Sequence, residues 1–234
     1  MIYVTSDLHG AHPEVMERLL EKAGFGDADY LFVLGDVIDR GNHGIDLLLW
    51  LTQLPNAQLI LGNHEAMMLS CRFLFEEVTE ESLEKLTLEN LKLMQTWVDN
   101  GGTGTIQAMK KLTKADPGLA EGIWEYLEDA PLYDMVTAGG KTYILTHAGL
   151  GNFSPHRPTT DYTPEELLMH RPSLSDRYFP DATVIFGHTP TQMYGMEYAG
   201  KALRTDTWID IDSGAAAGGN PMLLRLDDEQ EIYL

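Results

Sequence analysis

Short apolar runs alternate with amphipathic stretches along the first part of the chain. These runs are rich in β-branched and aromatic residues, which is typical of buried strands. The five runs that precede polar motifs are Ile2–Thr5, Tyr30–Leu34, Gln58–Leu61, Thr142–Thr146 and Thr183–Phe186. Between the first three, apolar residues recur at helical spacing, which predicts one helix from Pro13 to Ala23 and another from Ile45 to Leu54.

Alternating strands and helices predict a parallel sheet, whose ligand sites form beyond the carboxyl ends of the strands. The sequence Ala138-Gly139-Gly140-Lys141 predicts a hairpin turn leading into the fourth of these strands. Further apolar runs at Trp208–Ile211, Met222–Leu226 and Glu231–Leu234 predict a β-rich finish. We therefore expect an α/β fold in which two packed sheets are flanked by helices.

Residues 65 to about 130 break the alternation. Their pattern is largely helical, and Asn100-Gly101-Gly102 marks a turn within it. We interpret the segment as a helical insertion or cap within a single domain that spans residues 1–234. Its acidic side chains favour a solvated face over a docking surface for a partner. These side chains are Glu76, Glu77, Glu80, Glu81, Glu84 and Glu89.

Composition narrows the class of protein. The chain has 234 residues, of which 44% are apolar and 22% charged, as in an ordinary soluble globular protein. The formal charge of −20 opposes a nucleic-acid partner, and no apolar run is long enough to span a membrane. Met1 leads directly into a strand-like run, so no signal peptide is predicted, and Cys71 is expected to be a packed thiol. The expected location is cytoplasmic, and the sequence does not address the oligomeric state.

Five polar motifs stand where the apolar runs end. They supply carboxylates, imidazoles and one carboxamide, the mixture of donors that holds two divalent metals side by side. This oxygen and nitrogen set suits Mn²⁺, with Fe or Zn²⁺ as alternatives, and a single cysteine excludes a thiolate site. The motifs are Ser6-Asp7-Leu8-His9-Gly10, Gly35-Asp36-Val37-Ile38-Asp39-Arg40-Gly41, Gly62-Asn63-His64-Glu65, His147-Ala148-Gly149 and Gly187-His188.

The spacing within the motifs suggests how the metals are held. Asp7 and His9 are two residues apart, so in extended geometry both side chains leave on the same side and form a half-site. Asp36 follows the next strand and can place one oxygen on each metal. Asn63, His147 and His188 complete the second metal. Two metals about 3.5 to 4 Å apart can share a bridging hydroxide that attacks a phosphate ester.

The remaining polar residues have roles that a hydrolysis of this kind requires. His64 directly follows a ligand, and we assign it as the general acid that protonates the leaving alkoxide, with Asp39 orienting and charging the imidazole. Arg40 offers a planar fork of donors to the phosphate. Each motif alone is also compatible with an ordinary hydrogen-bonded strand end that has no chemical role. Five such motifs in one chain, all at strand ends, argue against that interpretation. His43 repeats the Gly-Asn-His triplet, yet it follows a charged turn and is expected to be a solvated helix-start residue.

The ordered set of motifs resembles the calcineurin-like metallophosphoesterase superfamily and, within it, the phosphoprotein phosphatase family of serine/threonine phosphatases. The compact size is similar to the bacterial and bacteriophage members. The resemblance implies an αββα sandwich with a dinuclear metal site between strand-end loops. It assigns the first metal to Asp7, His9 and Asp36, and the second metal to Asp36, Asn63, His147 and His188.

The resemblance also implies further roles around the substrate. It gives His64 the acid role, Asp39 the role of its partner, and Arg40 contact with phosphate. A second phosphate-binding arginine is expected, and Arg171 matches it best, with Arg157 and Arg177 as alternatives. The expected substrate-binding set is Arg40, Arg171, Asn63 and His64. Ser6 stands where the family often has glycine, which predicts a small change in loop geometry without loss of metal.

Two enzymatic functions follow from this. The first is a metal-dependent phosphomonoesterase that acts on phosphoserine and phosphothreonine in proteins, or on small phosphoesters. The alternative is a symmetrical dinucleoside tetraphosphatase, resembling Ap4A hydrolases, which would need basic residues and stacking aromatics beyond the phosphate clamp. The segment after His147 is short of basic residues, which favours the phosphatase. A catalytically dead scaffold would have eroded ligand positions, and none is eroded here.

Overall fold

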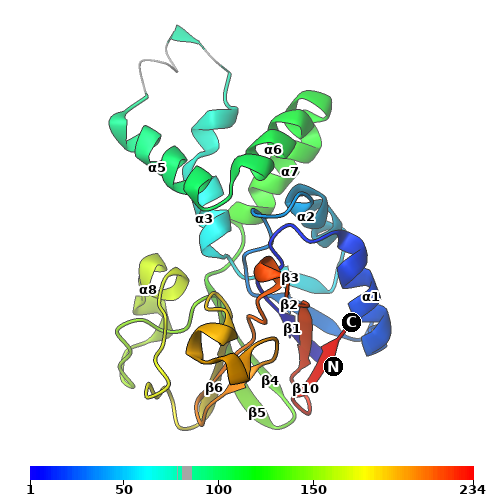
Figure 1. Ribbon diagram of the computed structural model, residues 1–234, viewed down its shortest axis with the longest axis vertical. Coiled ribbons are helices and arrows are strands. Elements are labelled where there is room, and N and C mark those ends of the chain that lie inside the picture. The colour runs from blue at the N-terminus through cyan, green and yellow to red at the C-terminus, as the bar shows by residue number, and fades with distance from the viewer. Residues whose placement is uncertain (78, 81–85) are drawn as a thin grey trace.

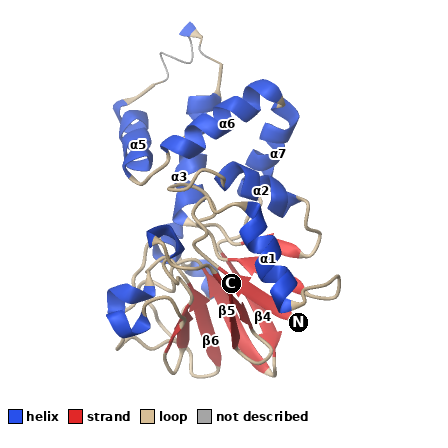
Figure 2. Cartoon of the chain, turned by 45° about the vertical axis from the view of Figure 1, so that its right-hand side comes forward, coloured by secondary structure: helices blue, strands red, loops and turns tan. Residues whose placement is uncertain are grey.

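The computed structural model describes residues 1–77, 79–80 and 86–234. It contains two five-stranded sheets, which lie in the lower part of Figures 1 and 2 with helices beside and above them. The first sheet has the order β10-β9-β1-β2-β3 and the second β4-β5-β6-β8-β7. The strands of the first sheet are β1 (Ile2–Thr5), β2 (Tyr30–Val33), β3 (Ala57–Leu59), β9 (Met222–Arg225) and β10 (Gln230–Tyr233). Those of the second are β4 (Tyr133–Ala138), β5 (Lys141–Thr146), β6 (Ala182–Phe186), β7 (Leu203–Arg204) and β8 (Trp208–Asp210).

Each sheet contains three adjacent parallel strands. In the first sheet β1, β2 and β3 are parallel, with Val4 opposite Phe32. In the second, β5, β6 and β8 are parallel, with Leu145 opposite Ile185. Antiparallel strands complete both sheets. The expected parallel core, the β-rich finish and the two-sheet α/β class are confirmed.

The hairpin between β4 and β5 is confirmed. Ala138 pairs with Lys141, which leaves Gly139 and Gly140 as the two turn residues. Their φ angles are 55° and 78°, the left-handed region that glycine enters without strain.

Helices cover the outer faces of the sheets. Two of them follow the first two strands, and α1 begins where the His12 side chain accepts a hydrogen bond from the Glu14 N–H, with Pro13 in its first turn. His43 lies at the start of α2, half-exposed, with its ring Nδ1 3.0 Å from Asp46, in agreement with a helix-start residue. The helices are α1 (Pro13–Ala23), α2 (Gly44–Thr52), α3 (Asn63–Ser70), α5 (Leu88–Asp99), α6 (Thr103–Ala115), α7 (Pro117–Glu128) and α8 (Pro164–Leu168).

The segment between β3 and β4 is helical, as the sequence predicted. Helices α3, α5, α6 and α7 rise from the sheets at the top of Figure 1. The predicted turn joins α5 to α6, where Gly101 has a φ of 98° and a Cβ at Gly102 would lie 2.6 Å from the Trp97 ring. Of the acidic side chains, Glu81 and Glu84 lie outside the described residues. The others, Glu76, Glu77, Glu80 and Glu89, are exposed.

Three apolar clusters hold the layers together. One lies between the sheets and joins Val4 and Phe32 to Tyr143 and Leu145. A second packs the inner faces of α1, α2 and the helical segment against the first sheet, and a third lies under α8. Cys71 is fully buried in the second cluster, and burial raises the pKa of its thiol, as expected for a packed cysteine. Among the described residues, no helix combines the length and apolar character that crossing a bilayer requires.

Candidate metal centre

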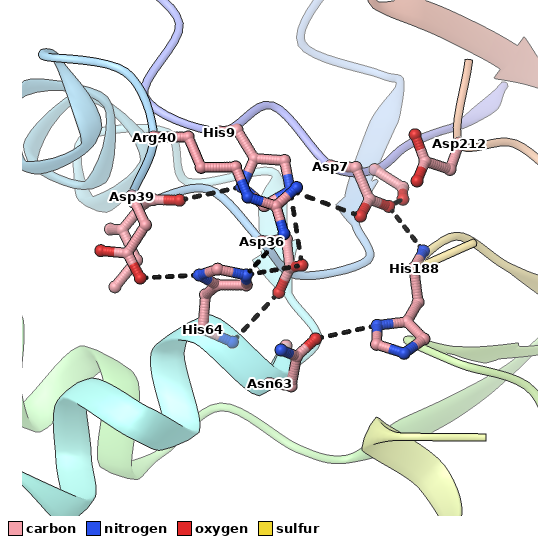
Figure 3. A network of polar contacts seen from close by, with 12 residues as sticks. Asp7, His9, Asp36, Asp39, Arg40, Asn63, His64, His188 and Asp212 are labelled. Atoms are coloured by element: carbon pink, nitrogen blue, oxygen red, sulfur yellow. Dashed lines mark hydrogen bonds and ion pairs between the residues drawn. The ribbon is translucent and has the colours of Figure 1, made fainter. Parts of the chain in front are cut away.

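Six strand ends converge on one cluster of polar side chains. The carboxyl ends of β1, β2, β3, β5, β6 and β8 each lie just before a residue of the cluster. These strands form two trios of parallel strands, so the loops that follow them lie together, and Figure 3 shows polar side chains of these loops in one network. All six side chains are buried: Asp7, Asp36, Asn63, His147, His188 and Asp212.

His9 and two carboxylates form the first group of donor atoms. The Nε2 atom of His9 lies 3.8 Å from Asp7 Oδ1 and 3.6 Å from Asp36 Oδ2. Its Nδ1 lies 3.2 Å from the Ile38 carbonyl oxygen, which can only accept, so Nδ1 carries the proton. Nε2 therefore presents a lone pair, in agreement with the Arg40 guanidinium that donates to it at 2.9 Å. Such a ring is oriented as a metal ligand.

Asp36, Asn63 and two imidazoles form the second group. His147 Nδ1 donates to the Leu34 carbonyl at 2.7 Å, which leaves Nε2 with a lone pair. That Nε2 lies 2.8 Å from Asn63 Oδ1, 3.2 Å from His188 Nδ1 and 3.4 Å from Asp36 Oδ1. Asp36 thus directs Oδ2 to the first group and Oδ1 to the second.

These two groups fit divalent cations. The carboxylate, carboxamide and imidazole groups offer more lone pairs than the hydrogen-bond donors of the cluster can use. His188 Nε2 is buried without a hydrogen-bond partner. Donor atoms of His9, Asp36 and the neighbouring His64 all lie within 4.8 Å of one another, and so do those of Asp36, His147 and His188. Borderline and hard divalent metals prefer such oxygen and nitrogen ligands. The cluster is a candidate divalent metal site.

The electrostatics of the cluster also favour a cation. Burial, with the charges of Asp212 and Asp36, raises the pKa of Asp7 well above its usual value. Burial raises the pKa of Asp36 to about 7. Burial and nearby cationic groups lower the pKa values of His9 and His188 to about 2, so both imidazoles are neutral donors of lone pairs. A bound cation would relieve the repulsion between the carboxylates.

Many residues of the site have a left-handed backbone. This finding corrects the extended geometry that the spacing of Asp7 and His9 predicted. Asp7 and His9 have φ angles of 53° and 39°, so the extended geometry predicted for them is wrong. Hydrogen bonds from His9 N to Asp36 O at 2.8 Å and from Gly10 N to Val37 O at 2.7 Å turn the loop toward its neighbour. The two side chains still approach each other, with His9 Nε2 3.8 Å from Asp7 Oδ1. The other left-handed site residues are Asp36, Asp39, Arg40 and His188.

Glu65 supports this backbone, a role that sequence reasoning missed. Its buried carboxylate accepts four backbone N–H groups. Oε2 accepts from Asp36 N at 2.8 Å and Gly62 N at 3.1 Å, and Oε1 accepts from Val37 N at 2.9 Å and Ile38 N at 3.2 Å. The loop that carries Asp36 is therefore held from within the molecule by one side chain.

His64 and Asp39 form a buried pair beside the donor groups. His64 Nδ1 lies 2.7 Å from Asp39 Oδ2, and His64 Nε2 lies 3.2 Å from Arg40 Nη2 and 3.8 Å from Asp36 Oδ2. Burial lowers the pKa of His64, but the hydrogen bond to Asp39 and the surrounding carboxylates outweigh it, so the pKa lies above its usual value. The pair has the geometry of an imidazole charged and oriented by a carboxylate.

Of the three candidate arginines after His147, Arg171 alone contacts the site within the part of the chain that the structure describes. Its Nη1 donates to the His188 carbonyl and to Thr189 Oγ1, both at 3.2 Å. Arg157 is held by the two oxygens of Glu166 at 2.9 and 2.7 Å. Arg177 donates to backbone carbonyls in its own loop.

Two further carboxylates, Asp210 and Asp212, were not predicted. Asp212 N donates to Asp210 Oδ1 at 2.9 Å, and both side chains are buried. Burial raises the pKa of Asp212 to about 6 and that of Asp210 well above its usual value. Their position is the signal that would have found them, because Asp210 lies within the apolar run 208–211 and Asp212 directly follows it.

Ser6 adds a donor to Asp7. The Ser6 hydroxyl and the His188 N–H, the latter at 2.8 Å, both donate to Asp7 Oδ2. The other oxygen, Oδ1, faces His9. Ser6 therefore leaves Oδ1 of Asp7 free to face His9.

Comparison with known proteins agrees with this geometry. The family model for calcineurin-like phosphoesterases matches residues 1–192. The chain belongs to this family. It is therefore a metallophosphoesterase, a hydrolase, and its cluster of His and Asp side chains is a candidate divalent metal site.

Its relatives include enzymes of both substrate classes. Serine/threonine-protein phosphatase 1 of Salmonella typhimurium is 26% identical over 238 residues, which cover 96% of this chain and 91% of that protein. The symmetrical bis(5'-nucleosyl)-tetraphosphatase of Buchnera aphidicola is 37% identical over 70 residues, but these cover 29% of this chain and only 25% of that protein. A crystal structure described as a "putative diadenosine tetraphosphatase" shares the fold, with a TM-score of 0.63, 20% identity and coverage of 100% of this chain and 92% of that one.

Proposed function

We propose that this metallophosphoesterase is a phosphomonoesterase that hydrolyses phosphoserine and phosphothreonine in proteins. It would use two divalent metals, with Mn²⁺ as the expected pair. When bound, the metals supply positive charge to the phosphate oxygens and lower the pKa of the attacking water. The first metal would be held by Asp7, His9 and Asp36, and the second by Asp36, Asn63, His147 and His188.

The observation that carries this proposal is the buried pair of His64 and Asp39. Serine and threonine leave a phosphate ester as alkoxides, which are strong bases and need a proton as the P–O bond breaks. His64 can hold that proton on Nε2 while Nδ1 remains bonded to Asp39 at 2.7 Å. A phosphoanhydride leaves as a phosphate group, a much weaker base that needs little help. The pair therefore favours ester chemistry.

The arginines around the site support a single phosphoryl group as ligand. Arg40 reaches the site from the loop after β2, where its guanidinium lies against His9 and His64. Arg171 reaches it from beside the His188 loop. Each presents a fork of donors that suits phosphate oxygens. Because Glu166 holds Arg157 and backbone carbonyls hold Arg177, these two are not free to extend the clamp along a tetraphosphate.

One relative supports the proposed substrate class, and others support the alternative. The similarity to the Salmonella serine/threonine phosphatase runs through nearly the whole of both chains. The 37% identity to the Buchnera tetraphosphatase supports the second candidate, a symmetrical dinucleoside tetraphosphatase, but it is confined to 70 residues.

The test compares two substrates on one preparation. Mn²⁺-loaded protein is assayed for phosphate release from a phosphoserine peptide and for nucleotide release from diadenosine tetraphosphate, with EDTA-treated protein as the blank. We expect kcat/KM to favour the peptide by about tenfold or more, which corresponds to about 1.4 kcal/mol of discrimination between transition states. Preference for the dinucleotide would overturn the proposal in favour of the second candidate.

A further inference from the structure

Two helices of the segment between β3 and β4 reach the Asp39 carboxylate. The Trp97 indole N–H, from α5, donates to Asp39 Oδ2 at 2.8 Å. The Thr105 hydroxyl, from α6, donates to Asp39 Oδ1 at 2.6 Å and accepts from the Asp39 backbone N–H at 3.1 Å. All three side chains are buried. These bonds link residues 58 and 66 positions apart in the chain.

The bonds fix the orientation of the carboxylate. Oδ2 of Asp39 accepts hydrogen bonds from the Trp97 indole and from His64 Nδ1, while Oδ1 accepts one from the Thr105 hydroxyl. An ionised carboxylate only accepts hydrogen bonds, so every group around it is a donor, as the chemistry requires. Asp39 cannot rotate without breaking a buried bond. His64 is in turn held by Asp39, and its Nε2 stays directed toward Arg40 and Asp36.

The turn between α5 and α6 makes a second attachment beside the first. The Arg40 backbone N–H donates to the Gly101 carbonyl at 3.2 Å. A Cβ at Gly101 would lie 3.0 Å from Arg40 Cγ, and one at Gly102 would strike the Trp97 ring. The close approach therefore requires glycine at both positions. Residues 97–105 thus form hydrogen bonds to Asp39 through two side chains and to the Arg40 N–H through the backbone.

We propose that Trp97 and Thr105 are positioning residues for the acid step, acting on His64 through Asp39. The inference rests on the acid role proposed above for His64. In that step the P–O bond breaks with its electron pair on the leaving oxygen, and the Nε2 proton of His64 moves to that oxygen. The Nδ1 proton remains bonded to Asp39, which Trp97 and Thr105 hold in place. The helical segment then contributes to the chemistry as well as covering the site.

Conservative variants test this role. Thr105→Val and Trp97→Phe each remove one donor and keep much of the side-chain shape. We expect kcat on phenyl phosphate to fall about tenfold, as a fraction of the 10²- to 10⁴-fold that a general acid contributes, with KM and metal content unchanged. The loss on p-nitrophenyl phosphate should be smaller, because its leaving group is a weaker base. Thr105→Ser, which keeps the hydroxyl, should restore the rate.

Matched controls come from the same helices. Thr113→Val lies on α6, where the Thr113 hydroxyl donates to the Met109 carbonyl and not to Asp39. Trp124→Phe lies on α7, where the buried Trp124 packs against Phe75. Both should keep wild-type rates on both phosphates. Circular dichroism and metal content are measured for every variant, and Thr105 and Trp97 provide independent tests if one variant fails to fold.

A double-mutant cycle with His64→Asn separates positioning from a merely structural role. If Thr105 acts through His64, Thr105→Val should cost less than about twofold in the His64→Asn background. An undiminished tenfold loss in that background would overturn the inference. Full activity of His64→Asn on phenyl phosphate would overturn the acid role and the inference together. Because the cycle uses aryl phosphates, failure to hydrolyse a phosphopeptide would refute only the proposed substrate.

Discussion

Glu65 offers the sharpest test of how the fold holds the site. Its carboxylate accepts four buried backbone N–H groups, two on each oxygen. In Glu65→Gln one oxygen becomes an NH₂ group, which would point its hydrogens at two N–H donors. Two bonds are lost and two buried donors are left without partners. Hydrogen bonds to charged groups contribute about 1.5 to 3 kcal/mol each, so the loss of two should lower the free energy of unfolding by about 3 to 6 kcal/mol.

The assay is urea unfolding of the metal-free protein, followed by a measurement of Mn²⁺ affinity. A loss of this size is a large fraction of the stability of an ordinary domain, and weaker metal binding should accompany it because the Asp36 loop loses its support. Glu17→Gln, on the exposed face of α1, is the matched control and should change the free energy by no more than about 0.5 kcal/mol. A loss below about 1 kcal/mol for Glu65→Gln, with unchanged metal affinity, would refute the reasoning.

Three further outcomes are expected. Arg171→Ala should raise KM for a phosphoserine peptide about tenfold or more, whereas Arg177→Ala should leave it unchanged, and equal effects in steady-state assays would contradict the clamp. Because burial raises the pKa of Asp36 to about 7 and of Asp212 to about 6, the folded metal-free protein retains protons that the unfolded chain releases. Their contribution to the free energy of unfolding is therefore complete below about pH 4, the usual range of an unfolded carboxyl, and is lost progressively as the pH rises to about 7. The melting temperature in EDTA should fall as the pH rises over this range, and Mn²⁺ should reverse the fall. A melting temperature that rises with pH in EDTA would contradict the raised pKa values of the two carboxyls. In leaving-group assays, His64→Asn should lose far more activity on an alkyl phosphate than on p-nitrophenyl phosphate while keeping its metal, and equal losses would remove the acid assignment.

The positions of the site residues were predictable because they follow from a local rule. An apolar run that ends in Asp, Asn or His places that side chain at the carboxyl end of a parallel strand, and parallel ends meet. The structure brings Asp7, Asp36, Asn63, His147 and His188 together for this reason. The same rule, applied to the run 208–211, would also have pointed to Asp212, which follows it.

The supporting contacts were not predictable, because they depend on packing between segments far apart in the chain. The left-handed backbone at Asp7 and His9 results from hydrogen bonds to the neighbouring loop, which override the extended geometry that spacing alone suggests. Trp97 and Thr105 are spaced as ordinary helix residues, and only the fold brings them to Asp39. Periodicity reveals which residues are buried, but it does not reveal which buried polar atoms meet.

The central claim, a pair of metals that share Asp36, is tested most directly by counting bound ions. Equilibrium dialysis against Mn²⁺, with metal and protein measured in the same sample, should give two ions per chain for the wild type. Asp36→Asn keeps one carbonyl oxygen and should hold no more than one ion under the same conditions. Asp46→Asn, at an exposed position on α2, should still hold two. One ion in the wild type, or two in Asp36→Asn, would contradict the account.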